Sequence, residues 1–460
     1  MSTPYRRIAV LDIGKTNAKV VILDAATGAE IAAVKTGNAV LPGGPYPHYD
    51  VDALWRFALQ ALTGFATMPG FDAVSITTHG ACAALLDRDG RLALPVLDYE
   101  HAYDDTVRTD YDRLRPDFAE TYSPRLAVGL NLGAQLHYQK TVFPDAFASV
   151  ATILAYPQYW AWRLTGVAAN EVTSLGCHTD LWLPKSGEFS PLVDSLGIRA
   201  LMAPIRSAFD PLGPILPRIA AEIGVAGTIP VYCGIHDSNA SLLPHLVGRA
   251  APFAVVSTGT WVVNFAVGGD MSHLDPSRDT LANVDAYGRA VPSSRFMGGR
   301  EFEMLSKTIG AVAPEVVELA LPDVIARGLM LLPNVVPGSG PFPGQAMAWL
   351  NDGQATDAER SAAGSLYLAL MTQACLDLIG AGGSIVVEGP FALNRVYIAA
   401  LSSLTGLKVT ALPGSTGTSL GAALLTGVTP TNAAPPLQAA LTLPSLGDYR
   451  SVWYQHISTR

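Results

Sequence analysis

The chain has 460 residues, of which 49% are apolar and only 15% charged, so it can form two or three packed domains and is too apolar to be disordered. Its 30 Lys and Arg against 39 Asp and Glu give a formal net charge of −9, which argues against a broad nucleic-acid-binding face. No apolar run approaches the roughly 20 residues that span a bilayer, and residues 1–7 do not resemble a signal peptide. We therefore expect a cytoplasmic protein that binds neither nucleic acid nor membrane.

Short strands joined by tight turns open the chain. Residues 8–12, 18–23 and 30–34 read as strands, separated by a Gly-Lys-Thr-Asn turn and an Ala-Thr-Gly turn. A strand, a glycine-bearing turn and a strand recur over residues 253–263, where Gly259 lies 245 positions after Gly14. The recurrence predicts one supersecondary unit that occurs twice.

Helical periodicity alternates with short β-rich runs in both halves, which indicates α/β domains whose sheets are covered by helices. The strongest such segments are helices 52–63, 365–379 and 396–404 and strands 73–77 and 384–388. We place the domain boundary after residue 245, giving domains 1–245 and 246–460, with Pro244 and residues 248–252 as the hinge.

The cysteines carry no metal or disulfide pattern. Four are present, far apart in the sequence, and they form neither a Cys-x-x-Cys pair nor a His/Cys cluster. They read as reduced, buried side chains: Cys82, Cys177, Cys233 and Cys375.

The first turn is the first candidate for chemistry. Its Gly14-Lys15-Thr16 sequence is not a P-loop, because Ala9 replaces the first glycine of that motif and a strand follows instead of a helix. The alternative is a strand–turn–strand cradle in which Gly14 to Asn17 hold phosphoryl oxygens and Asp12 holds Mg²⁺ through water. An ordinary hairpin turn with a solvated lysine stays open. The second copy, Ser257-Thr258-Gly259-Thr260, favours the phosphate cradle.

A second candidate is Asp237, in Gly234-Ile235-His236-Asp237-Ser238-Asn239-Ala240 just past a short strand at 229–233. An acid in that position is well placed to act as a general base. It could equally cap the following helix, and the spacing by itself favours capping.

Two glycine-bearing segments late in the chain could hold a nucleoside. Residues 382–394, which include Gly389 and Asn394, place a loop between a strand and a helix. Residues 414–421, which include Thr416, could form a second wall of that pocket or simply a closely packed helix.

Taken in order, these motifs resemble the FGGY carbohydrate kinases of the actin/hexokinase-like superfamily, near the fuculose and rhamnulose kinases. The resemblance covers nearly the whole chain and implies an α/β fold of two ribonuclease H-like domains with a cleft between them. It implies that Asp237 accepts the proton of a sugar hydroxyl and that Asp12 positions Mg²⁺. It also assigns ATP contacts to both turns and the late glycine segments: Gly14, Lys15, Thr16, Asn17, Ser257, Thr258, Gly259, Thr260, Gly389, Asn394 and Thr416.

The sugar side departs from the family pattern. Asp98 and Ala102 replace the Trp and Arg of the family's sugar loop, Glu100 replaces its Asp, and Lys15 stands where the family usually has Thr. An ammonium is a good phosphate partner, so Lys15 is expected to contact phosphate. The expected sugar contacts are His79, Gly80, Asp98, Glu100, His101, His236 and Asp237, although His79 could also be a purely structural histidine.

These expectations amount to an ATP- and Mg²⁺-dependent kinase that phosphorylates a ketose or polyol, with 6-deoxyketohexoses and pentuloses as the expected acceptors. The alternative is a non-catalytic sensor that binds sugar or nucleotide on the same fold. The expected partner is a small-molecule sugar, and a homodimer is left open.

Overall fold

The computed structural model describes residues 5–414, 417–431, 441, 443 and 445–459. The described residues form two compact units. Unit 1 takes in those of Met1–Gly248, Ala282–Ala290 and Thr416–Ala433, and unit 2 takes in those of Arg249–Leu281, Val291–Ser415 and Ala434–Arg460. Two segments from the second half of the chain therefore belong to the first unit.

Unit 1 is built on a seven-stranded sheet with the order β12-β13-β6-β1-β2-β3, in which β14 also pairs with β6. The first hairpin is antiparallel and places Asp12 directly opposite Lys19, while β1 runs parallel to β6. The strands are β1 (Arg7–Ile13), β2 (Asn17–Asp24), β3 (Glu30–Gly37), β6 (Ala73–Thr78), β12 (Pro211–Pro214), β13 (Pro230–Tyr232) and β14 (Ile235–His236).

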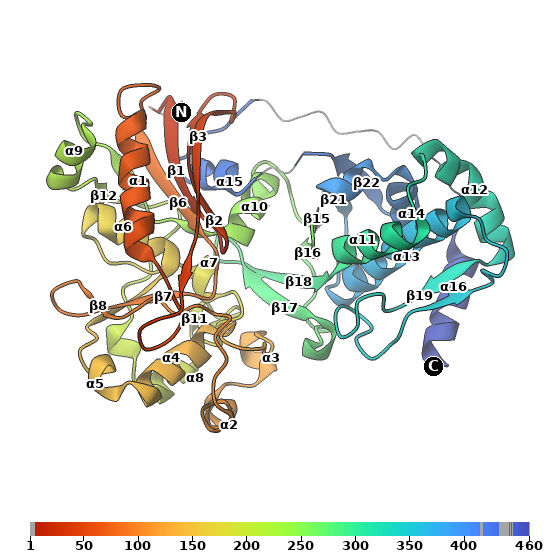
Figure 1. Cartoon of the computed structure of the whole chain (residues 1–460), viewed down its shortest axis with the longest axis horizontal. Helices are drawn as coiled ribbons and strands as arrows, with labels where there is room; N and C mark the ends of the chain where they lie inside the picture. Colours follow the sequence, from red (N-terminus) through yellow and green to blue (C-terminus); the bar gives the residue numbers. More distant parts are fainter. Residues whose placement is uncertain (1–4, 415–416, 432–440, 442, 444, 460) are drawn as a thin grey trace. The chain divides into compact units, whose positions relative to one another are not determined.

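Helices pack on this sheet because its strands are apolar on both faces: all six residues of β6 are buried. Figure 1 shows α1 and α6 beside one face and α10 and α15 beside the other. The helices are α1 (Val51–Phe65), α6 (Tyr156–Thr165), α9 (Pro217–Ile223), α10 (Asp237–Leu246) and α15 (Thr418–Leu424). Pro244 lies inside α10, so it is not the hinge that the sequence suggested.

The rest of unit 1 surrounds a second, smaller core. A three-stranded sheet with the order β8-β7-β9 packs beside short helices. Its elements are β7 (Ala83–Leu86), β8 (Leu92–Leu94), β9 (Thr152–Ala155), α2 (Asp105–Leu114), α3 (Phe118–Thr121), α4 (Leu132–Val142), α5 (Pro144–Phe147), α7 (Val172–Leu175) and α8 (Pro191–Ser195). Two pairs of two-residue strands and one 3-10 turn complete it: β4 (Val40–Leu41), β5 (His48–Tyr49), β10 (Trp182–Leu183), β11 (Glu188–Phe189) and η1 (Arg199–Leu201).

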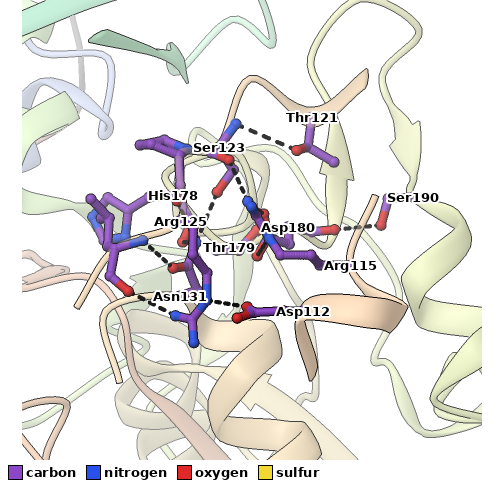
Figure 2. Close-up of polar contacts among 12 residues, drawn as sticks. Asp112, Arg115, Thr121, Ser123, Arg125, Asn131, His178, Thr179, Asp180 and Ser190 are labelled. Carbon is purple, nitrogen blue, oxygen red and sulfur yellow. Dashed lines mark hydrogen bonds and ion pairs between the residues drawn. The ribbon is translucent and has the colours of Figure 1, made fainter. Parts of the chain in front are cut away.

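A buried polar network holds this smaller core together (Figure 2). The Arg115 guanidinium donates to both carboxylate oxygens of Asp180, at 2.9 and 3.3 Å, and to the carbonyl of Ser123 at 2.7 Å. The Asn131 side chain bonds three further backbone groups, among them the amide of Leu126 at 2.9 Å. The network therefore ties residues 115–131 to the segment around Asp180.

Unit 2 repeats the opening motif of unit 1. The hairpin β15 (Phe253–Thr258) and β16 (Val262–Val267) is antiparallel, and β15 runs parallel to β21 (Ser384–Glu388). The predicted repeat is thus present, with Gly14 donating to the Asn17 carbonyl and Gly259 to the Trp261 carbonyl, both at 2.9 Å. The sheet of this hairpin also contains β17 (Thr280–Val284), most of which is assigned to unit 1, β18 (Ala290–Phe296) and β22 (Lys408–Leu412). A separate pair is formed by β19 (Met330–Leu332) and β20 (Ala348–Leu350).

The long helix α13 forms the centre of unit 2 and packs against α11, α12 and α14 (Figure 1). It begins eight residues before the predicted start, because Thr356 and Glu359 form a capping box in which each side chain bonds the other's backbone amide. The helices of unit 2 are α11 (Gly298–Ile309), α12 (Pro314–Arg327), α13 (Asp357–Leu378), α14 (Arg395–Thr405) and α16 (Gly447–Ser458), with 3-10 turns η2 (Pro276–Arg278) and η3 (Pro390–Leu393). None of the helices in the described part of the chain combines the length and apolar character of a membrane span.

Candidate functional site

Asp12 lies near the end of β1 and is almost completely buried. Its Oδ2 accepts hydrogen bonds from the hydroxyls of Thr418 and Ser419, the latter at 2.9 Å, and the Lys19 ammonium lies 3.6 Å away. Sequence reasoning missed all three neighbours. Lys19 carried a signal, because hairpin register places it opposite Asp12, whereas Thr418 and Ser419 are about 400 residues distant and carried none.

The turn after β1 is pinned by its backbone. Besides the Gly14–Asn17 bond, the Asn38 side chain donates to the Gly14 carbonyl at 2.8 Å, and Thr16 and Asn17 are exposed at the tip. Lys15 does not extend into solvent: its side chain is 19% exposed and forms an ion pair with Asp98. The solvated-lysine interpretation of this turn is therefore wrong.

Asp237 is the first residue of α10, and His236 is the N-cap. The interpretation of Asp237 as the N-cap is thus wrong, although its charge still lies in the favourable first turn. The His236 Nε2 lies 3.2 Å from Asp237 Oδ1, and Asn239 lies 3.4 Å from the other ring nitrogen, Nδ1. If Asn239 donates to Nδ1, the proton of the neutral ring is on Nε2 and is donated to Asp237.

The electrostatics of this pair suit a base. Burial raises the pKa of Asp237 to about 6, and burial lowers the pKa of His236 to about 4, so the imidazole is neutral at pH 7. Asp237 makes no ion pair with a Lys or Arg among the described residues. Its carboxylate, 29% exposed, is therefore ionised near neutrality while remaining able to accept a proton.

His79 and Gly80 follow β6 and lie beside Asp237. His79 is 5% exposed, burial lowers its pKa to about 4, and Nδ1 lies 3.0 Å from the Gly80 carbonyl, so Nδ1 carries the proton. Its other nitrogen, Nε2, is a buried acceptor without a hydrogen bond in the described structure. Gly80 packs under His236, since a Cβ there would lie 2.7 Å from His236 Nε2.

The three remaining predicted sugar contacts lie in different surroundings. Asp98 is buried, accepts from the Tyr49 hydroxyl at 3.2 Å and pairs with Lys15. Glu100 is largely exposed, 3.5 Å from Lys15. His101 Nε2 lies 3.1 Å from the Tyr138 hydroxyl, and its ring lies in an aromatic cluster with Tyr103. Asp98 and Glu100 are thus brought to Lys15, while His101 packs against tyrosines.

Unit 2 presents the second turn. The Thr258 hydroxyl donates to the Glu388 carbonyl at 2.5 Å and accepts from the Phe391 amide at 3.1 Å, so it is used within the unit. Gly259 and Thr260 are exposed, and Ser257 is partly buried. The start of α11 approaches this turn closely: a Cβ on Gly299 would lie 1.9 Å from the Gly259 carbonyl oxygen. The Gly298-Gly299 pair is a signal that sequence reasoning missed.

A cavity of about 400 Å³ lies in unit 2 between α11, α12, α13 and the start of α14. Apolar side chains such as Leu305, Ile309 and Val317 line most of it. Asn394 lies in its wall, donates to Ser365 at 3.0 Å and caps α14, as expected of a pocket residue. This volume and lining are typical of a small-molecule site.

Gly389, also assigned to the nucleoside, is used in packing within unit 2. A Cβ on Gly389 would lie 2.1 Å from the Thr258 carbonyl oxygen, so Gly389 packs closely against that carbonyl. Thr416 lies outside the described residues. The segment that follows, 417–424, belongs to unit 1. There Gly421 lies directly against the Ala240 carbonyl, since an added Cβ would be 1.7 Å from it. This part of the 414–421 segment is therefore a closely packed helix, the second of the two alternatives.

Two tryptophans that alternate in the sequence, Trp160 and Trp162, are packing residues. Trp160 is fully buried in the core of unit 1, and the Trp162 ring stacks on Tyr159, with centroids 6.0 Å apart. The four cysteines all lie in the described part of the chain, form no disulfide and are buried, as predicted.

Two family models cover almost the entire chain. The N-terminal domain of the FGGY family of carbohydrate kinases matches residues 7–244, and the FGGY C-terminal domain matches residues 250–435. A carbohydrate kinase from Novosphingobium aromaticivorans is 38% identical in sequence and has a TM-score of 0.92 over 100% of this chain and 99% of that one.

Two more distant relatives are also named as sugar kinases. The L-fuculokinase of Salmonella typhi is 26% identical over 314 residues, which is 66% of this chain and 66% of that relative, just under two thirds of its length. The xylulose kinase of Rhodospirillum rubrum shares the fold, with a TM-score of 0.80 at 18% identity over 99% of this chain and 98% of that one.

Proposed function

The chain belongs to the FGGY family of carbohydrate kinases, and from this premise we propose that it transfers the γ-phosphoryl group of ATP to a hydroxyl of a ketose or polyol. The similarity to an L-fuculokinase supports a 6-deoxyketohexose as acceptor, and pentuloses are the neighbouring class. No described feature favours the alternative of a non-catalytic sensor.

Unit 1 would hold the acceptor and start the reaction. Asp237 accepts the proton of the attacking sugar hydroxyl while the oxygen of that hydroxyl forms a bond to the γ-phosphorus. The bond between the γ-phosphorus and the oxygen that bridges it to the β-phosphorus breaks, and ADP is released. His236 orients the carboxylate through the 3.2 Å contact, and the neutral Nε2 of His79 accepts a hydrogen bond from another sugar hydroxyl. Positioning of this kind is the main contribution a protein makes to phosphoryl transfer.

The phosphates and nucleoside would be held by groups already described. Within unit 1, Thr16 and Asn17 at the exposed tip of the first turn would offer polar groups to phosphoryl oxygens, and Lys19 adds a positive charge beside Asp12. Within unit 2, the exposed Thr260 would offer its hydroxyl. The apolar cavity of unit 2, with Asn394 in its wall, has the size for an adenosine.

The residues present also fit a magnesium ion that is completed by substrate. Asp12 Oδ2 is occupied by two hydroxyls, but Oδ1 makes no hydrogen bond within the described structure. The described residues contain no group of three or more His, Cys, Asp or Glu that could hold a metal by themselves. One carboxylate oxygen together with phosphate and water ligands is the usual Mg²⁺ arrangement at nucleotides, where the ion neutralises phosphate charge.

The observation that carries this proposal is the pairing of Asp237, a carboxylate with a raised pKa, with the unpartnered buried nitrogen of His79. Buried polar atoms normally find partners, so an orphan beside a candidate base indicates a place for substrate.

Asp237→Asn tests the proposal. It preserves shape and hydrogen bonding but cannot accept the proton, so kcat for sugar phosphorylation should fall by about 10²–10⁴-fold while the melting temperature and ATP binding persist. Coupled ADP release with a panel of ketoses and polyols is the measurement.

Asp52→Asn is the matched control, because Asp52 also lies in the first turn of a helix, α1, and is largely exposed. It should leave kcat unchanged. If Asp237→Asn behaves like Asp52→Asn, Asp237 serves only its helix and the proposed mechanism is wrong.

A further inference from the structure

Lys15 belongs by sequence to the first turn, yet its side chain is directed to the loop at 98–100. The ammonium forms an ion pair with Asp98 and lies 3.5 Å from Glu100. It also lies 5.0 Å from the ring centroid of Tyr49 and 4.7 Å from that of Tyr99. Aromatic faces on both sides and a carboxylate ahead fix the position of this charge.

Asp98 is equally fixed and retains one free acceptor. Its Oδ1 accepts from Lys15, from the Tyr49 hydroxyl at 3.2 Å and from the Glu100 amide at 3.3 Å. Its backbone amide donates to the Pro47 carbonyl at 3.0 Å. Oδ2 makes no hydrogen bond within the described structure, so one oxygen of a held carboxylate is left to accept from a ligand.

The pair lies next to the candidate sugar contacts. The His79 ring packs against both tyrosines that flank Lys15, with centroids 5.0 Å from Tyr49 and 5.7 Å from Tyr99. The charges of Asp237 and Lys15 both act on His79. Lys15, Asp98, His79 and Asp237 therefore form one cluster within unit 1.

The charge balance of this cluster is negative. Two carboxylates, those of Asp98 and Glu100, lie beside the Lys15 ammonium, and the cluster also contains the Asp237 carboxylate. The histidines His79 and His236 are neutral at pH 7. A hydroxyl can donate to Asp98 Oδ2 and accept from Lys15. A sugar carboxylate would find the ammonium already neutralised and would face like charges, which cost several kcal/mol when brought together.

We propose that the Lys15–Asp98 pair is a selectivity element: it binds a hydroxyl of an uncharged sugar and disfavours sugar acids, because Asp98 neutralises the Lys15 ammonium that would otherwise bind a carboxylate. The proposal rests on the proposed sugar kinase function and names the charge class of its acceptor. It assigns Lys15 to the sugar rather than to the phosphate.

The first test uses the unmodified chain. Its kcat/KM for the best of L-fuculose, L-rhamnulose and L-xylulose should exceed that for six-carbon sugar acids such as gluconate by at least about 100-fold. A sugar acid phosphorylated within tenfold of the best ketose would overturn the proposal.

Asp98→Asn gives the sharper test, since it keeps the shape while freeing the lysine charge. The ratio of kcat/KM for sugar acid to that for ketose should rise by at least about tenfold. The double variant Lys15→Gln with Asp98→Asn should return the ratio to its original value, because the freed charge is then gone. Asp112→Asn, an exposed site with the same change of net charge, should leave the ratio unaltered. An unchanged ratio in folded Asp98→Asn overturns the proposal.

Calorimetry of the binding of the same ketoses and sugar acids distinguishes a failure of the proposed kinase function from a failure of the proposed selectivity. If no sugar supports ADP release, the proposed function fails, yet the affinities of the unmodified chain and of Asp98→Asn still decide the selectivity. An Asp98→Asn variant that gains no affinity for sugar acids contradicts the pair's role whether or not the chain is a kinase.

Discussion

The polar network around Asp180 and the cluster around Asp237 lie in the same unit, and each centres on a carboxylate: that of Asp180 is fully buried, and that of Asp237 is 29% exposed. Asp180 accepts hydrogen bonds from the Tyr111 hydroxyl at 2.5 Å and from two nitrogens of Arg115. Figure 2 shows Arg115 beside Asp180. The Asp237 carboxylate contacts the neutral ring of His236, and it forms no ion pair with a Lys or Arg within the described part of the chain. A neighbour of Asp237, His79, has an unpartnered ring nitrogen, whereas Arg115, Asn131 and Asp180 have no unpartnered buried side-chain atom among the described residues.

The same residue types therefore serve two purposes, stabilising the fold at Asp180 and, in the proposed function, binding a ligand at Asp237. A buried carboxylate with every bond made stabilises one arrangement of the chain and has nothing left for a ligand. A carboxylate that packing partly desolvates without a Lys or Arg partner has a raised pKa, and this is the usual property of a functional group. Substitutions at the two centres should therefore affect different measurements.

The largest expected effect on folding is at the satisfied centre. Asp180→Asn removes the charge that compensates the buried Arg115 guanidinium, so the free energy of unfolding should fall by about 3–5 kcal/mol in urea denaturation. Asp112→Asn removes the half-exposed partner of Arg125 and should cost less than about 1 kcal/mol. Equal losses in the two variants would mean that burial does not distinguish these ion pairs.

The next effect is on pH dependence, at the unsatisfied centre. Asp237 must be deprotonated to act as a base, and its pKa is raised to about 6. The value of kcat/KM should therefore be constant above pH 6 and fall tenfold per unit below it, a loss of about 100-fold at pH 4. Initial rates from pH 4 to 8, with folding at pH 4 checked by circular dichroism, give the profile. A flat profile between pH 7 and 5 would contradict this assignment.

The smallest expected effect is on the packing of α15 against α10, which holds Thr418 and Ser419 against Asp12. Gly421→Ala would place a Cβ 1.7 Å from the Ala240 carbonyl, so it should destabilise by about 1–3 kcal/mol through overpacking. Gly364→Ala is the control in another helix, α13. Its Cβ would meet Leu305 at 3.6 Å, and better helix propensity should stabilise the chain by about 0.5–1 kcal/mol. Thermal unfolding of both variants is the measurement, and a stabilised Gly421→Ala would refute close packing of α10 and α15.

The sequence predicted the fold well where local patterns determine it. The predicted family and the two-domain α/β fold are confirmed, and strand 384–388 has the predicted bounds. The start of α13 was wrong by eight residues although Thr356 and Glu359 carried its signal, because apolar periodicity was given more weight than capping.

The candidate site was predictable only in part. Asp12 and Asp237 stand out because each follows or ends a strand beside a glycine, which local sequence shows. The pairing of Lys15 with Asp98 joins residues 83 positions apart, and that of Ser419 with Asp12 joins residues 407 apart. Such pairs depend on how elements pack, and no spacing in one sequence reveals them. Lys15 was consequently predicted to bind phosphate, while its ammonium contacts the loop at 98–100.

Helix α15 has a consequence for the order in which unit 1 is made. Ser419 follows Asp12 by 407 residues, so at a synthesis rate of about 5–20 residues per second it leaves the ribosome about 20–80 seconds later. During that interval the nascent β1 strand lacks the hydroxyls that bind Asp12 and the helix that packs against β1 and β6. Strand β1 therefore reaches its final surroundings only after Ser419 has been synthesised.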